Sequence, residues 1–113
     1  MNIRKLLSIS LLCVAFAASA KGQAIVSQAY ELGLDEFRAP VTTNGGIAFK
    51  ECDECEQKRI RVTEATSYAI NGKRVRLEDF RKAVSHANDR EKTTVIVLHH
   101  LESDTVVSIN VSL

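Results

Sequence analysis

The chain has 113 residues, with 15 basic and 14 acidic side chains, a formal net charge of +1, 5% aromatic residues and no tryptophan. A net charge this close to zero excludes the strongly basic chains that bind nucleic acid, and the length leaves room for one small domain. Its core has to be built from Val, Ile and Leu with a few Phe and Tyr, so we expect a thin core.

The first 20 residues are typical of a secretory signal peptide. Arg4 and Lys5 precede an apolar run over residues 6–18, and Ala18-Ser19-Ala20 supplies small residues for cleavage. The run is shorter than the about 20 apolar residues of a membrane-spanning helix. We therefore expect cleavage near Ala20 and a periplasmic or secreted mature chain without a transmembrane anchor; a retained signal anchor is the alternative.

Residues 21–45 carry a mixed pattern. Leu32 and Phe37 fit one helical face, which Gly33 interrupts and Pro40 ends. We expect an irregular or partly helical segment here.

Residues 46–113 are expected to form a small antiparallel α+β domain. In its first predicted hairpin, Ile47 and Phe49 alternate with Ala48 and Lys50, and Ile60 and Val62 alternate with Arg59, Arg61 and Thr63. Cys52 and Cys55 then lie at the hairpin tip.

A second hairpin is predicted by Asn71-Gly72, because both residues tolerate the positive φ angles of a type I′ turn. Pairing about this turn sets Tyr68 opposite Val75. The next apolar residues recur at helical spacing, at Leu77, Phe80, Ala83, Val84 and Ala87. They predict one short amphipathic helix that ends near Asn88.

The last stretch predicts a third hairpin, around Ser103-Asp104. With Leu101 opposite Val106, one face would hold Ile96, Leu98, His100, Val107, Ile109 and Val111. His99 would then point the other way, into solvent, and His100 would be partly buried.

The order of elements is strands, a helix, and strands again, with connections short enough for antiparallel neighbours. It predicts an α+β fold of mostly antiparallel β hairpins, as a small sheet or partly open barrel, with one short amphipathic helix. The run RVTEATSYAINGKRVRLEDF, followed by VIVLHH and VVSINV, resembles small bacterial periplasmic β-barrel domains of the OB-like kind. In those domains a strand, a T-x-Y hairpin and an L-x-D step precede two closing strands. The resemblance covers roughly Arg61 to Val111 and implies a binding module without naming a substrate.

The C-D-E-C motif allows three interpretations. We favour a disulfide across the hairpin tip, which an oxidising compartment permits. A thiol-redox centre needs surroundings that stabilise a thiolate, but the four neighbouring carboxylates disfavour one. We expect no cofactor, and the alternative is a zinc site built from Cys52, Cys55 and His99.

Charge is divided along the chain. Residues 30–57 carry seven acids and two bases, whereas residues 58–82 carry eight bases and three acids. If the strand that contains Arg59 borders the Asn-Gly hairpin, four arginines project from one face: Arg59, Arg61, Arg74 and Arg76. Such a patch suits an anionic partner, either an unknown protein or an anionic envelope component. The alternative is a solvated face that the chain's own acidic segment partly neutralises.

No catalytic motif stands out, because the chain lacks G-x-S-x-G, H-E-x-x-H and a phosphate-binding glycine loop. We therefore expect no catalytic residues and a non-enzymatic protein. The predicted function is that of an exported binding or accessory domain that uses the disulfide-closed acidic tip and the arginine face. The alternative is a metal-binding or thiol-redox protein that uses the cysteine pair; partner and oligomeric state stay open.

Overall fold

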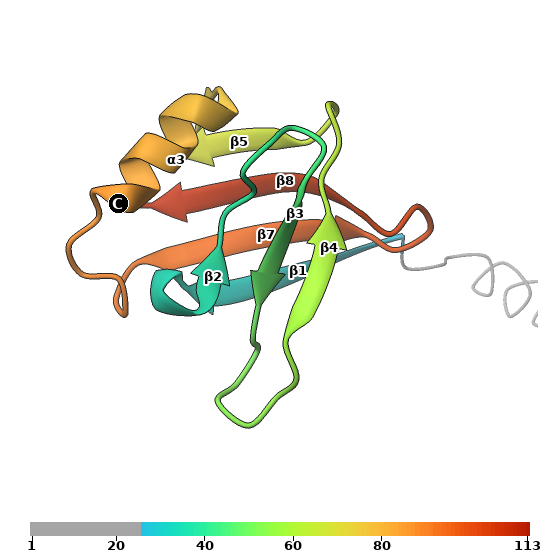
Figure 1. The fold of residues 1–113 in the computed structure, drawn as a ribbon, viewed down its shortest axis with the longest axis horizontal. Helices are drawn as coiled ribbons and strands as arrows, with labels where there is room; N and C mark the ends of the chain where they lie inside the picture. The colour runs from blue at the N-terminus through green and yellow to red at the C-terminus, as the bar shows by residue number, and fades with distance from the viewer. Residues whose placement is uncertain (1–25) are drawn as a thin grey trace, which may run out of the picture.

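The structure, a computed structural model, describes residues 26–113 (Figure 1). In chain order its elements are β1 (Ser27–Gly33), the 3₁₀ turn η2 (Leu34–Glu36), β2 (Phe37–Arg38), β3 (Gly46–Phe49), β4 (Lys58–Arg61), β5 (Ser67–Ile70), β6 (Lys73–Val75), helix α3 (Leu77–Ser85), β7 (Thr94–His100) and β8 (Thr105–Ser112). None of the described helices is long and apolar enough to cross a membrane. The predicted signal peptide and its cleavage site near Ala20 lie outside the described residues.

The described strands form one open sheet rather than a closed barrel. Its order is β1-β7-β8-β4-β3-β2, with β5 also paired to β8 and β6 paired to β5. β8 is antiparallel to β7 but parallel to both β4 and β5. These two parallel pairs correct the expectation of antiparallel neighbours throughout, which considered only strands adjacent in the chain. The α+β class, a mostly antiparallel sheet with one helix, is confirmed.

The core lies between two layers of this sheet. β2, β3 and β4 cross in front of β1, β7 and β8, and α3 lies beside β5 (Figure 1). The rings of Tyr30 on β1 and Phe49 on β3 join the layers, with centroids 5.0 Å apart. At the helical end, the rings of Tyr68 and Phe80 lie 5.4 Å apart. The buried apolar residues are Tyr30, Leu32, Leu34, Phe37, Ile47, Phe49, Ile60, Val62, Tyr68, Phe80, Val84, Val95, Val97, Val106, Ile109 and Val111.

The Asn-Gly hairpin has the predicted register, with Tyr68 opposite Val75. Asn71 and Gly72 take positive φ angles of 52° and 82°, as a type I′ turn requires. The turn is also fixed to β8, because the Gly72 N–H donates to Asn110 Oδ1 at 2.9 Å.

Helix α3 is amphipathic as predicted, with Phe80 and Val84 buried, but it ends at Ser85 rather than near Asn88. His86 leaves helical geometry, and the guanidinium of Arg90 donates to the Val84 carbonyl at 2.8 Å. A side chain thus satisfies a carbonyl that a further helical turn would have bonded.

The segment before residue 46 differs from the expected irregular or helical chain. Ser27–Gly33 is a seven-residue strand that pairs with β7 along its whole length. Tyr30 and Leu32 are buried and Glu31 is exposed, so the period is two. Gly33 does not interrupt a helix, contrary to the expectation: its backbone is extended, and η2 follows it directly.

The third hairpin forms, but with another register and with the faces of β7 reversed, so that the buried Ile109 and Val111 of β8 lie opposite Val97 and Val95. The core side of β7 holds Val95, Val97 and His99, whereas Ile96 is 42% exposed. A β-bulge between Leu98 and His99 shifts the register, so that His99 lies opposite Val106. Because residues 95–98 are all apolar, alternation could not distinguish the two faces, and the bulge could not be read from the sequence.

Candidate functional site: an arginine-lined groove

A groove of about 700 Å³ lies over the outer side of β2, β3 and β4. Its lining comes from these strands, from the loop after β2 and from the turn between β7 and β8. The lining residues are Arg38, Ala39, Val41, Gly45, Gly46, Ile47, Ala48, Arg59, Ile60, Arg61, Ser103 and Asp104. We call this cavity the arginine groove.

Strand register explains why the surface is hollow here. Ala48 on the middle strand lies between Arg38 on β2 and Arg59 on β4 in one cross-strand row. In the next row on the same face, Gly46 lies beside Arg61. Two of the smallest side chains therefore form the floor, and long cationic side chains stand at its sides.

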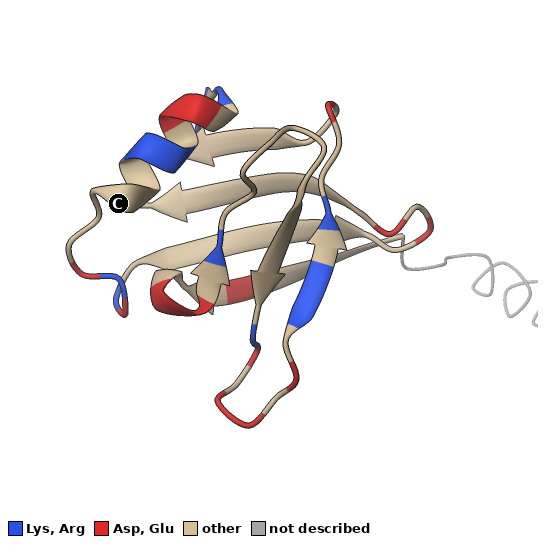
Figure 2. Ribbon diagram, in the orientation of Figure 1, with Lys and Arg blue, Asp and Glu red and all other residues tan. Residues whose placement is uncertain are grey.

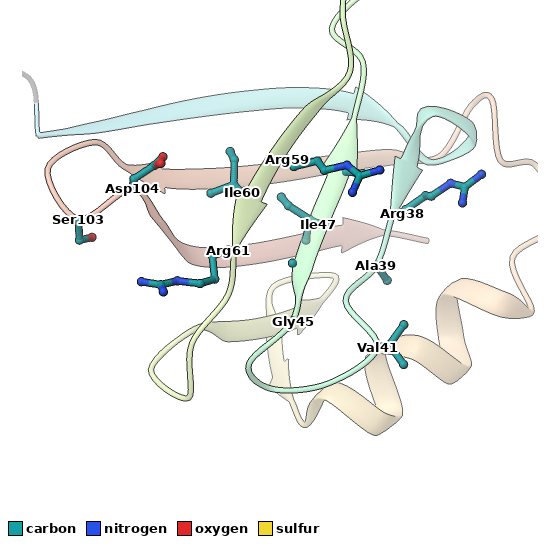
Figure 3. Close-up of a pocket in the computed structure, with 12 residues that line it drawn as sticks. Arg38, Ala39, Val41, Gly45, Ile47, Arg59, Ile60, Arg61, Ser103 and Asp104 are labelled. Atoms are coloured by element: carbon teal, nitrogen blue, oxygen red, sulfur yellow. The ribbon is translucent and has the colours of Figure 1, made fainter.

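The three arginines are available for a ligand. No ion pair among the described residues involves Arg38, Arg59 or Arg61. Arg59 extends towards Arg38 across β3, and Arg61 extends the other way, towards the turn that carries Ser103 and Asp104 (Figure 3). Asp104 is the one acidic side chain of the lining, so the groove is net positive.

Two of the four predicted binding arginines lie elsewhere. β4 does not border β5 and β6, because β4 and β5 pair with successive parts of β8. Arg74 therefore belongs to the β6 end of the sheet, and Arg76 lies 3.7 Å from Asp79 at the start of α3. The basic residues of β2 and β4 and those around β6 form separate groups (Figure 2). The prediction of one patch of four arginines is therefore wrong, because it required the strand of Arg59 to border the Asn-Gly hairpin.

Sequence reasoning missed Arg38 as a member of the site. Phe37 is buried and Arg38 is exposed, so even this two-residue strand alternates. The signal was present in the sequence, but only the pairing of β2 with β3 brings Arg38 to the same face as Arg59.

The predicted disulfide between Cys52 and Cys55 is present at the tip of the β3–β4 hairpin. Four exposed carboxylates surround it, from Glu51, Asp53, Glu54 and Glu56. Glu51 pairs with Lys58 at 3.2 Å, and the Lys58 ammonium lies 5.0 Å from the centre of the Tyr30 ring. The acidic tip is thus attached to the body through the base of its own hairpin.

A second contact joins the acidic tip to the body. A hydrogen bond with Asp53 raises the pKa of Glu36 above its ordinary value of 4.5, and the nearby charges of Asp53 and Asp35 act in the same direction. A cavity of about 270 Å³ lies here and shares Arg38 and Ala48 with the arginine groove.

The histidines are placed differently from the sequence expectation. His99 is not solvated but only 9% exposed, because it alternates with Val95 and Val97 on the core side of β7. Its Nε2 donates to Asp104 Oδ1 at 2.8 Å, and the Tyr30 hydroxyl lies 3.4 Å from its Nδ1. His100 Nδ1 accepts from the Ser103 N–H at 3.2 Å. His99 therefore holds a groove residue, Asp104, in position.

In the part of the chain that the structure describes, no three His, Cys, Asp or Glu side chains are grouped so as to hold a metal ion. The alternative zinc ligands Cys52, Cys55 and His99 are accordingly not gathered in one place.

Comparison with known proteins gave no relative: no protein family, no curated protein and no solved structure matches this chain.

Proposed function

We propose that this protein is a non-enzymatic binding domain that takes an anionic partner in the arginine groove. The observation that carries this proposal is the set of three arginines around a floor of Gly46 and Ala48, with no ion pair of their own in the described chain. Guanidinium groups bind carboxylates and phosphates through paired hydrogen bonds, and an uncompensated group of them attracts anions.

Strand register gives the spacing of the three arginines along the backbone. Arg38 and Arg59 are two strands apart, which is about 10 Å, and Arg59 and Arg61 are alternate residues of one strand, about 7 Å apart. Because the side chains of Arg59 and Arg61 extend in opposite directions, a partner that contacts all three arginines needs several anionic groups spread along the groove (Figure 3). An extended acidic segment of a protein offers such a series, because alternate side chains of an extended chain lie about 7 Å apart on one side.

The acidic tip is a second contact surface in this proposal. Its disulfide holds four carboxylates in one loop beyond the groove, so the same partner would meet cations along the strands and anions at the tip. A partner with an acidic segment followed by basic residues would fit both.

The test is binding of a fluorescent hexaglutamate peptide, measured by anisotropy, with hexaglutamine and hexalysine as control peptides. We expect the variant Arg38→Gln/Arg59→Gln/Arg61→Gln to weaken hexaglutamate binding at least tenfold, about 1.4 kcal/mol. The matched control Arg81→Gln/Lys82→Gln/Lys92→Gln removes the same charge outside the groove and should keep most of the affinity. Equal losses in the two variants would show that net charge alone drives binding and would refute the groove.

A further inference from the structure

The sheet has a second exposed face, on the side of β1, β7, β8 and β5 away from the core. Register sets its residues in cross-strand rows. One row is Ala29, Leu98, Ser108 and Ser67, and the next is Glu31, Ile96, Asn110, Ala69 and Arg74. None of these residues is buried, although their neighbours on the core side are, so no described element covers this face. We call it the neutral face.

Charge on the neutral face is confined to its two edges. Within the two rows, Glu31 on β1 and Arg74 on β6 alone carry a formal charge, and they stand at opposite ends of the same row. Four strand spacings separate them, about 19 Å. Neither takes part in an ion pair of the described chain.

Side-chain size on the neutral face is also arranged about β8. The bulky residues Ile96 and Leu98 lie on β7, to one side of β8. Ala69 and Ser67 occupy the same two rows on β5, to the other side. Large residues on one side are thus matched, row by row, by small residues on the other.

We propose that the neutral face binds a second copy of this chain, with a two-fold axis parallel to β8. Such an axis places β7 of each copy over β5 of the other, so Ile96 lies against Ala69 and Leu98 against Ser67. It also brings Glu31 of each copy to Arg74 of the other. Large residues meet small ones and each charge meets its opposite, as a self-complementary interface requires.

The occupant follows from this symmetry. An unrelated protein would need no relation between the two sides of β8, whereas a second copy needs both the size match and the charge match, and both are present. The neutral face is about 20 Å across. We expect it to bury less surface than the interface of a tight dimer, and therefore expect a dissociation constant in the micromolar range.

The experiment is sedimentation velocity from about 5 to 500 μM, a range that brackets micromolar dissociation, on the protein purified after any processing in the expressing host. We expect a monomer–dimer equilibrium. Ile96→Glu should weaken dimerisation at least thirtyfold with an unchanged circular dichroism spectrum. The reason is that each copy would bury a carboxylate against Ala69 of the other copy.

Charge reversal then identifies the geometry. Glu31→Arg and Arg74→Glu should each weaken the dimer several-fold, and the double variant should restore it. Glu102→Arg and Arg81→Glu, which reverse exposed charges outside the neutral face, should change little. A monomer at every concentration, or a dimer that is insensitive to Ile96→Glu, would overturn the proposal. The arginine groove uses other residues, so either proposal can fail alone.

Discussion

The two exposed faces of this sheet use small residues in different surroundings. In the arginine groove, Gly46 and Ala48 lie between arginines on both neighbouring strands, and a cavity of about 700 Å³ results. On the neutral face, Ser67 lies beside the uncharged Ser108, and Ala69 lies between the uncharged Asn110 and Arg74, so charge flanks these small residues on one side at most. The flanking charge distinguishes a site suited to an anionic ligand from a surface suited to another sheet.

The largest effect is expected from a substitution in the core, which should weaken binding at both faces because they share one core. Phe49 is 1% exposed, and its ring packs on Tyr30 between the two layers. We expect Phe49→Ala to lower the free energy of unfolding by about 3–5 kcal/mol, measured by urea titration. Both hexaglutamate binding and dimer formation should then fall.

A matched control is Val41→Ala, since Val41 is 69% exposed and should change stability by less than about 0.5 kcal/mol. Wild-type stability in Phe49→Ala would mean that the layers do not depend on this contact.

Removing the disulfide should have a smaller effect, concentrated on one face. Closing a four-residue loop stabilises a chain by at most about 1.9 kcal/mol. We expect Cys52→Ser/Cys55→Ser to cost no more than this in urea titration and to leave the neutral face unaffected, because the tip lies at the end of the β3–β4 hairpin. A loss of dimer formation would contradict the separation of the two faces.

Ionic strength should separate the faces further. Raising salt from 0.1 M to 1 M shortens the screening length from about 10 Å to about 3 Å. Hexaglutamate binding should weaken about tenfold, an energy of about 1.4 kcal/mol, whereas dimerisation, which rests mainly on uncharged residues, should change about threefold or less, or about 0.6 kcal/mol. Similar salt dependence in anisotropy and sedimentation would contradict the contrast.

The smallest effect concerns the contact between the acidic tip and the body. The pKa of Glu36 is raised in the folded chain, so this contact adds stability at pH below the ordinary value of 4.5 and loses it as pH rises through the raised value. An NMR titration of the Glu36 side chain should show a midpoint above 4.5 that falls in Asp53→Asn. An unchanged midpoint would exclude Asp53 as the cause.

Where one face of a strand lacks bulky apolar residues, the sequence predicted its register. The Asn71-Gly72 hairpin and the alternation around Ile47 and Ile60 were correct for this reason. β7 has four consecutive apolar residues and a bulge, and for such a strand the choice of face depends on the rest of the fold.

The candidate site was predicted only in part, because pairing between distant strands assembles it. Arg59 and Arg61 were named correctly as outward-facing residues of one strand. Arg38 lies on the same face only because β2 pairs with β3. Arg74 lies outside the site because β4 and β5 pair with successive parts of β8. Local periodicity describes one strand at a time and contains no information on such neighbours.

The pairing of β8 also bears on when the fold can form during synthesis. β8 is the last strand in the chain, yet β4, β5 and β7 all hydrogen-bond to it. Until Thr105–Ser112 has emerged from the ribosome, those three strands lack their common neighbour, and the available pairings are those of the hairpins and of β1 with β7. Folding therefore has to wait for the C-terminal strand, and its long-range pairings favour slow assembly over stepwise folding from the N-terminus.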